Sequence, residues 1–376
     1  MQYFFGLIAT YNILIYFHFS LGGFGMYKLA YYITKNKTVS FVAGCIVTFS
    51  AYHFARSLGH FNLFLIGWVS LFILYFIKMM DTEAGWKLPA IFFILAAYSD
   101  LYYMLYLVGF IVLYFVFEYF QNNLQIKRSY PSDDVYKFIL AIILFVGPYI
   151  GAMMYMKMFT TEFNVPGHDP AFYSNDLLSF FVPGQSTFLG HYFYNIWVHW
   201  SGFWESSVYL GLSVILLIIF TLFNNDLRKR KEVKFFMLVA LIFGILSLGP
   251  YLHIGGRIFN SVKLPYLFFQ KFVPLMSIQG VASRMAMMVY IALALISAIS
   301  LNYVFKSKWR WKRIIIFIWF VILVFDYLPA KFDFQKVSIP DFYYTLVNVQ
   351  DDFAIIDVSS EWSKVMYYKL FTRRSW

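Results

Sequence analysis

Lysine and arginine residues in this 376-residue chain collect in every second gap between its apolar stretches. The ten stretches lie at 7–34, 38–52, 62–79, 88–99, 101–119, 136–158, 206–224, 235–252, 286–305 and 314–328. At about 1.5 Å of rise per residue, most of them are long enough to cross a hydrocarbon layer about 30 Å thick as helices. The alternation predicts an all-α polytopic membrane protein.

The odd-numbered gaps hold most of the basic residues that flank the stretches. These residues are Lys35 and Lys37, then Lys78 and Lys87, then Lys127, Arg128 and Lys137, then the run 228–231 with Lys234, and finally Lys306, Lys308, Arg310, Lys312 and Arg313. The positive-inside rule predicts that these gaps are cytoplasmic. Because the basic runs adjoin apolar stretches, we do not expect nucleic acid as a partner.

The composition excludes a soluble globular enzyme. Hydrophobic residues make up 61% of the chain and charged residues only 13%, against about 25% charged residues in soluble domains. The net charge of +11 follows from the basic gaps and favours contact with anionic lipids at the inner face. We therefore expect a multi-pass protein of the plasma membrane, with membrane lipids as partners.

The region 88–119 allows one long helix or two short ones that meet at Ser99-Asp100. One helix would place the cations before and after it on opposite sides of the membrane, whereas two helices keep all five basic gaps together. An aspartate in mid-bilayer would also cost several kcal/mol, and at a turn it stays hydrated. We therefore predict two helices, a break at Asp100 and about ten spans in total.

Ten spans place residue 1 outside, with neither a basic flank nor a signal peptide before it. We therefore expect the complete protein to have at least one more span and outer loop before Met1. Residues 1–328 form the predicted transmembrane domain. In the tail, 329–376, we predict a short helix at 340–349, a strand at 353–358 and an amphipathic segment from 361, which together would begin a small extracytoplasmic α/β domain.

Two large outer loops, near 159–205 and 249–285, contain half of the candidate site residues. A separate cluster lies at the outer end of the second stretch. Its His53, Arg56 and His60 are spaced three to four residues apart and would share one face of a continuing helix. They are either an interfacial group or a contact for an anion or a sugar.

Two carboxylates at the outer side are candidate catalytic residues, acceptor contacts or metal ligands. Asp100 would otherwise be a plain N-cap of the fifth span. Glu205 follows a tryptophan-rich segment at the mouth of the seventh span, and it is either an anchor or a carboxylate that faces a cavity.

The segment around Gly255-Gly256 supplies the remaining candidates. Glycines let the backbone approach a ligand closely, and two arginines in one segment, Arg257 and Arg284, can clamp a phosphate. His253 lies beside them. The outer histidines match no standard zinc spacing, so no histidine is assigned as a ligand, and a divalent metal ion remains an open possibility.

Several motifs occur in an order that resembles a known family. They are the run 49–63 (FSAYHFARSLGHFNL), 98–103 (YSDLYY), 175–183 (NDLLSFFVP), Glu205 before 209–211 (YLG), 247–252 (SLGPYL), 281–285 (VASRM) and 353–357 (FAIID) before 366–368 (MYY). The chain is similar over nearly its whole length to large bacterial and archaeal membrane proteins with a GT-C glycosyltransferase-type fold. Most members of that group are uncharacterised.

The resemblance implies transfer of a sugar from a polyprenyl-phosphate carrier to an acceptor glycan, lipid or protein at the extracytoplasmic face. In such enzymes the first outer loop supplies an aspartate or glutamate as the catalytic base, and that loop would lie before Met1. Cations would stabilise the departing lipid phosphate, a role for which Arg257 and Arg284 are the candidates; His53, Arg56, His60 and His253 are further substrate contacts.

Two other classes of function remain open from the sequence. A transporter or lipid flippase would suit ten spans, but such a carrier needs a site near the midplane, and ionisable residues are scarce in the middle of the stretches, where His18 is almost the only candidate. A non-catalytic membrane scaffold is the second alternative, since the expected first loop is not part of the chain.

Overall fold

The computed structural model describes residues 2–57, 60–121, 131–159, 168–273 and 280–331. The chain divides into two compact units, Met1–Ala330 and Lys331–Trp376. The helix, strand and amphipathic segment predicted for the tail lie outside the described residues. The fold below is that of the first unit.

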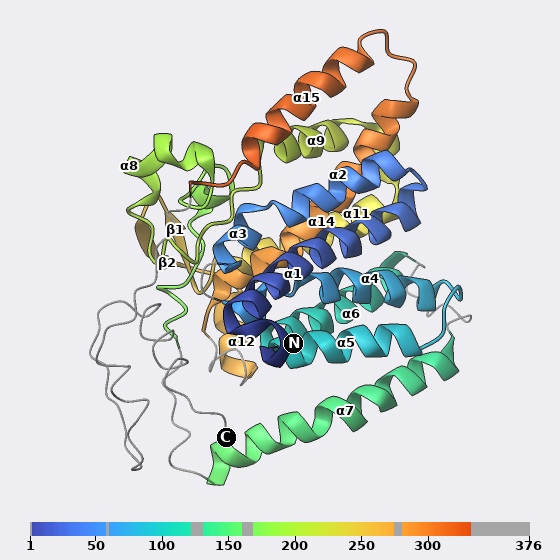
Figure 1. The fold of residues 1–376 in the computed structure, drawn as a ribbon, viewed down its shortest axis with the longest axis vertical. Helices are drawn as coiled ribbons and strands as arrows, with labels where there is room; N and C mark the ends of the chain where they lie inside the picture. The colour runs from blue at the N-terminus through green and yellow to red at the C-terminus, as the bar shows by residue number, and fades with distance from the viewer. Residues whose placement is uncertain (1, 58–59, 122–130, 160–167, 274–279, 332–376) are drawn as a thin grey trace. The chain divides into compact units, whose positions relative to one another are not determined.

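Each of the ten apolar stretches contains a helix of at least 12 residues (Figure 1). These helices are α1 (Gln2–Thr34), α2 (Lys37–Thr48), α4 (Ile66–Met80), α5 (Lys87–Ser99), α6 (Leu101–Gln121), α7 (Ser132–Phe159), α9 (Leu212–Phe223), α11 (Lys231–Ser247), α14 (Ala286–Lys306) and α15 (Lys312–Asp326). The break predicted at Asp100 is confirmed, because α5 ends at Ser99 and α6 begins at Leu101.

Three helical segments of the described chain are long and apolar enough to cross a membrane: Leu101–Gln121, Ser132–Met156 and Ala282–Lys306. A fourth arises if α2 and the short helix α3 (Ala51–Ser57), which meet at a bend of 45°, count as one span. The helical fold is thus confirmed and the described chain has helices able to cross a membrane, but three or four meet this requirement of length and composition, and not ten. For α4, α5 and α9 the physical reason is length, because they have 15, 13 and 12 residues and reach only about 18–22 Å.

Helix α14 lies at the centre of the packing, in contact with α1, α2, α9 and α11. Of its most apolar window, 89% is buried, whereas the corresponding share for α7 is 17%. Helix α7 packs mainly on α5 and exposes apolar side chains along most of its length. This is the pattern expected when α14 is enclosed by protein and α7 by lipid.

One end of the helices gathers the turns that the sequence marked as basic. Four side-chain pairs join these turns: Asn36 with Asn302, Tyr303 with Asp226, Lys231 with Glu118, and Tyr32 with Asp81. The helix α10 (Asn225–Lys229) also lies in one of the turns. These contacts bring four of the five basic gaps together.

The other end carries the short elements of the large loops. They are α3, η1 (Phe61–Phe64), η3 (Leu177–Phe180), η4 (Phe188–Phe193), α8 (Tyr194–Trp197), α12 (Tyr266–Phe272), η5 (Ala282–Met285) and the antiparallel hairpin of β1 (Tyr251–Ile254) and β2 (Arg257–Lys263). Figure 1 shows α3, α8 and the hairpin at the left, away from the α1–α2 turn. The 21 residues of α14 separate the two ends by about 31 Å, close to the thickness of a hydrocarbon layer.

Candidate functional site

Three charged side chains converge at the loop end of the helices, all of them buried. Arg56 on α3 donates through Nη1 to Oε2 of Glu205, and its Nη2 donates to the backbone oxygen of Glu205 at 2.6 Å. Arg284 on η5 donates from Nε to Oε2 at 3.3 Å and from Nη2 to Oε1 at 3.2 Å. One carboxylate therefore accepts from two guanidinium groups.

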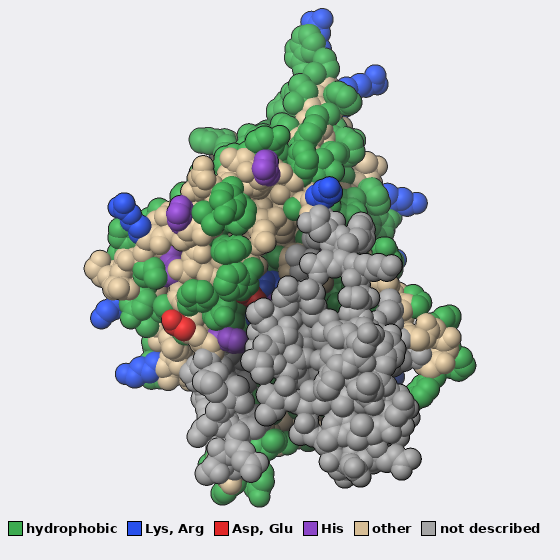
Figure 2. Space-filling model, turned by 60° about the vertical axis from the view of Figure 1, so that its left-hand side comes forward, with side chains coloured by type: hydrophobic (Ala, Val, Ile, Leu, Met, Phe, Trp, Pro, Cys, Tyr) green, Lys and Arg blue, Asp and Glu red, His purple; other side chains and the backbone are tan. Residues whose placement is uncertain are grey.

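His60 completes this ion cluster from the solvent side. Its Nε2 lies 2.8 Å from Oε1 of Glu205, and 40% of its side chain is exposed, against 3% for Glu205. Figure 2 shows the space-filling surface of the loop region, where histidine side chains reach the surface at several points and acidic side chains are few. His60 is therefore the most exposed side chain among the four that meet at Glu205.

The electrostatics of the cluster keep Glu205 ionised. Burial by itself would raise the pKa of the Glu205 carboxyl, but Arg56, His60 and Arg284 outweigh burial and hold that pKa well below its usual range. A carboxylate with so low a pKa is a poor proton acceptor at neutral pH. Glu205 is suited to holding the two arginines in place.

Two tyrosine rings position the guanidinium groups. Arg56 lies 4.9 Å from the ring centre of Tyr52, and Arg284 lies 5.0 Å from that of Tyr102. The Tyr52 hydroxyl donates to the backbone oxygen of Arg284 at 3.2 Å. Such cation–π contacts contribute more when the cation is desolvated, so the rings help to fix both arginines.

Asp100 lies beside the ion cluster, at the break between α5 and α6. Its Oδ1 accepts from the Tyr102 N–H at 2.7 Å, so the predicted N-cap is confirmed, and Oδ2 accepts from the Asn62 side chain. Burial raises the pKa of Asp100 above its usual value of 3.8, although the Tyr102 N–H, Arg284, Asn62 and His60 act in the opposite direction. Asp100 is thus better suited to exchange a proton than Glu205 is.

The cluster has unused hydrogen-bonding capacity. Arg56 Nε, Asn175 Oδ1 and Ser283 Oγ are buried and have no hydrogen-bond partner among the described residues. Asn175 and Ser283 are adjacent, because Asn175 Nδ2 donates to the Ser283 backbone oxygen at 3.3 Å. Buried polar atoms are normally paired, so unpaired ones near a buried charge group mark a place where a polar ligand or water can bind.

The structure separates three predicted site residues from the cluster. His53 is buried, and its two ring nitrogens lie 2.9 Å and 3.1 Å from the backbone oxygens of Thr48 and Phe64. His253 is buried on β1, and burial lowers its pKa. Arg257 is exposed on β2, so the structure does not bring it to Arg284, and Arg56 is the arginine that shares Glu205 with Arg284.

The glycine pair has a structural role. Gly255 and Gly256 have φ angles of 60° and 80° and form the two-residue turn of the hairpin, a turn that requires positive φ at both positions. The Gly256 N–H donates to Asp176 at 2.8 Å, and a Cβ at Gly256 would lie 2.4 Å from the His199 backbone oxygen. The close approach predicted from these glycines is therefore made to the protein itself.

The described residues contain no group of three or more His, Cys, Asp or Glu side chains that could hold a metal ion. Sequence reasoning missed three side chains that shape the site, namely Tyr52, Tyr102 and Asn62. Tyr52 adjoins His53 and Tyr102 follows Asp100 by two positions, so proximity to the predicted residues was the only available signal.

The fold and the ion cluster define a mainly helical protein with helices able to cross a membrane and a buried ionic site at one end. The chain belongs to the family described as "Domain of unknown function (DUF6311)", whose model matches residues 7–327. No significant match was found among curated proteins or among solved structures.

Proposed function

We propose that the protein is a multi-pass glycosyltransferase-like protein of the plasma membrane. It would transfer a sugar from a polyprenyl-phosphate carrier to an acceptor glycan, lipid or protein at the extracytoplasmic face. The observation that carries the proposal is the convergence of Arg56 and Arg284 on Glu205 beside the partly exposed His60. Part of the support is the resemblance of the sequence motifs to GT-C proteins.

The charge of the ion cluster suits a phosphate. Two guanidinium groups and one carboxylate leave one positive charge uncompensated in a buried setting. Cations that are already in place stabilise the charge that grows on a departing phosphate, and they do so more strongly where water is excluded. Arg56, Arg284 and His60 are the residues we assign to this role.

Asp100 is the acid–base candidate in this proposal. Its raised pKa and its place next to Arg284 suit a group that accepts the proton of an acceptor hydroxyl, whose oxygen then attacks the anomeric carbon while the lipid phosphate leaves. Glu205 is a positioning residue, because both of its carboxylate oxygens already accept from cations.

Ten crossings of the membrane belong to the proposal as well. Helices α4, α5 and α9 are short, yet a bilayer adapts to short apolar segments by local thinning. All basic turns would then face the cytoplasm, and the ion cluster would face outward.

Turnover of a polyprenyl-linked radiolabelled sugar by the full-length protein in proteoliposomes tests the proposal. We expect Arg284→Ala to lower turnover about 100-fold, as loss of one charge-stabilising donor does elsewhere. Asp100→Asn should lower it by a similar factor, as loss of an acid–base group does. Unchanged turnover in Arg284→Ala removes that residue from the site.

Two controls make the result specific. Asp226→Asn and Arg257→Ala remove comparable charges at exposed positions away from the cluster and should leave turnover within about twofold. Thermal unfolding of each variant separates lost chemistry from lost folding. Movement of a labelled solute across the membrane without covalent change would support a transporter or flippase and contradict the proposal.

A further inference from the structure

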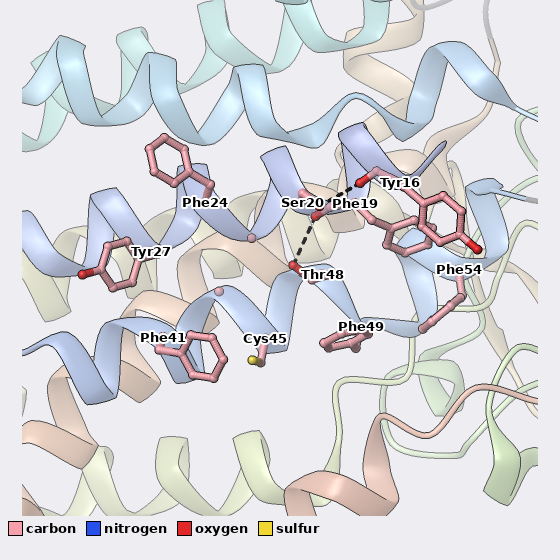
Figure 3. A pocket seen from close by; sticks show the side chains of 12 residues that line it. Tyr16, Phe19, Ser20, Phe24, Tyr27, Phe41, Cys45, Thr48, Phe49 and Phe54 are labelled. Carbon is pink, nitrogen blue, oxygen red and sulfur yellow. Dashed lines mark hydrogen bonds between the residues drawn. The ribbon is translucent and has the colours of Figure 1, made fainter. Parts of the chain in front are cut away.

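A groove of about 700 Å³ runs between α1 and α2 (Figure 3). Twelve residues line it, and seven of them are aromatic. Figure 3 shows rings from both helices along its length, with the Cys45 sulfur between Phe41 and Phe49. The groove lies outside the ion cluster, and its lining is almost entirely apolar.

Close contact of the two helix backbones forms the floor of the groove. A Cβ at Gly23 would lie 2.4 Å from Thr48 Oγ1, and a Cβ at Gly44 would lie 2.8 Å from the Gly23 backbone oxygen. The small residues therefore let the helices touch at the floor, while larger aromatic side chains stand along the sides. The result is a single channel and not a broad apolar face.

The length of the groove along α1 matches the thickness of one leaflet. It extends along α1 from Tyr16 to Tyr27, and these 12 residues span about 16 Å, roughly half of a 30 Å hydrocarbon layer. Its end at Tyr16, Phe49 and Phe54 is the end nearer the large loops, because α1 and α2 meet at the basic turn after Thr34. A hydrocarbon chain from the leaflet on the loop side has the matching length and position.

The loop end of the groove reaches the helix that carries the ion cluster. Phe54 lines the groove and Arg56 binds Glu205, and both belong to the short helix α3. An occupant whose apolar chain lies in the groove therefore has its head beside α3, the helix on which Arg56 also lies. One chain and an anionic head describe an isoprenoid phosphate better than a glycerophospholipid, which has two chains.

We infer that the groove between α1 and α2 binds the isoprenoid chain of a polyprenyl phosphate, whose phosphate is directed towards α3. This inference rests on the proposed function, and it adds the location of the lipid chain. The groove residues hold the chain by apolar contact alone. The cations of the cluster supply the contact with the phosphate.

Cys45, the single cysteine of the chain, reports on the groove directly. The full-length protein in nanodiscs is treated with N-ethylmaleimide, and intact mass gives the rate of alkylation with and without an added polyprenyl phosphate. We expect the lipid to slow alkylation of Cys45 at least fivefold. A Cys45→Ala/Leu216→Cys variant places the thiol on α9 at a position that is 42% exposed, and its alkylation rate should not change.

A variant in which a large side chain blocks the groove provides a second test. Ser20 is exposed in the groove and its hydroxyl donates to the Tyr16 backbone oxygen at 2.8 Å, so Ser20→Trp should fold and block the channel. Labelling by a photoactivatable polyprenyl phosphate should fall at least fivefold in Ser20→Trp and stay unchanged in Ile219→Trp, the same substitution on the exposed face of α9.

The outcomes separate the inference from the proposed function. Protection of Cys45 without any sugar transfer would keep the groove assignment and overturn the glycosyltransferase proposal. Sugar transfer without protection of Cys45 would keep the glycosyltransferase proposal and overturn the groove assignment. Equal protection by phosphatidylglycerol at the same mole fraction would identify the occupant as an ordinary membrane lipid and overturn the inference.

Discussion

Arg56 and Glu205 lie 149 positions apart in the sequence, and the Arg56 guanidinium donates to both the carboxylate and the backbone oxygen of Glu205. The pair joins α3 to the segment that follows the first large loop. Because Arg284 binds the same carboxylate from η5, three separate parts of the chain depend on one buried anion.

Removal of that anion should destabilise the protein strongly. Glu205→Gln leaves two buried guanidinium groups without a counter-charge, and breaking a buried pair in this way costs about 3–5 kcal/mol. We expect a loss of that size in the free energy of unfolding, measured by denaturant titration in detergent micelles.

An exposed pair on α11 provides the matched control for this prediction. Glu232 lies 3.4 Å from Arg230, and both side chains are about two-fifths exposed. Glu232→Gln should cost less than about 1 kcal/mol, because surface ion pairs contribute little. Equal losses in the two variants would show that the Glu205 cluster does not hold the loops together.

The same carboxylate should make the protein sensitive to acid. The folded pKa of Glu205 is held well below its usual value of 4.5, so its contribution to stability is complete above pH 4.5 and is lost as the pH falls below that value towards the folded pKa. The melting temperature, measured from pH 7 down to pH 3, should fall less steeply in Glu205→Gln than in the wild type.

Asp100 offers a control of opposite sign. Its folded pKa is raised above 3.8, so its own contribution to stability decreases as the pH rises above that value. Asp100→Asn should therefore not reduce the loss of stability in acid. If the melting temperature fell less with decreasing pH in Asp100→Asn than in Glu205→Gln, the acid sensitivity would belong to Asp100 and not to Glu205.

The end of a helix could be predicted from the sequence where the free-energy cost of burying a local charged residue determines it. An aspartate in mid-bilayer is costly, and the chain indeed breaks at Asp100. The ten apolar stretches also predicted the ten helices. Hydropathy does not, however, indicate where a helix ends within an apolar segment. Residues 206–211 are apolar in part and buried, yet α9 begins only at Leu212, after Gly211 with a φ of 90°.

The partners within the site were not predictable, because they come from distant positions. The spacing of Arg56 and His60 indicated a shared face, and both reach Glu205. The same spacing also suggested His53, whose ring instead lies between two backbone oxygens. Arg257 and Arg284 occur in one loop, but only the tertiary packing of η5, which contacts α11 and α14, determines which arginine is buried.

The N-cap at Asp100 can be separated from its proposed chemistry. The Asp100 carboxylate accepts from the Tyr102 N–H at 2.7 Å, and loss of such a cap in Asp100→Ala should cost about 1 kcal/mol. Asparagine caps nearly as well as aspartate, so Asp100→Asn should keep most of the stability, measured by thermal unfolding. Equal destabilisation in the two variants would mean that the charge of Asp100, and not the cap, stabilises this turn.

The sidedness of the loops can be measured in intact cells with an impermeant thiol reagent. In a Cys45→Ala background, Phe181→Cys places a thiol in the first large loop at a position that is 55% exposed, and Lys229→Cys places one in a basic turn, also exposed. The positive-inside rule puts the basic turn in the cytoplasm, so we expect labelling at 181 and none at 229 until the cells are permeabilised. Labelling at 229 with protection at 181 would reverse the orientation. The ion cluster would then face the cytoplasm, and sugar transfer at the outer face would be impossible.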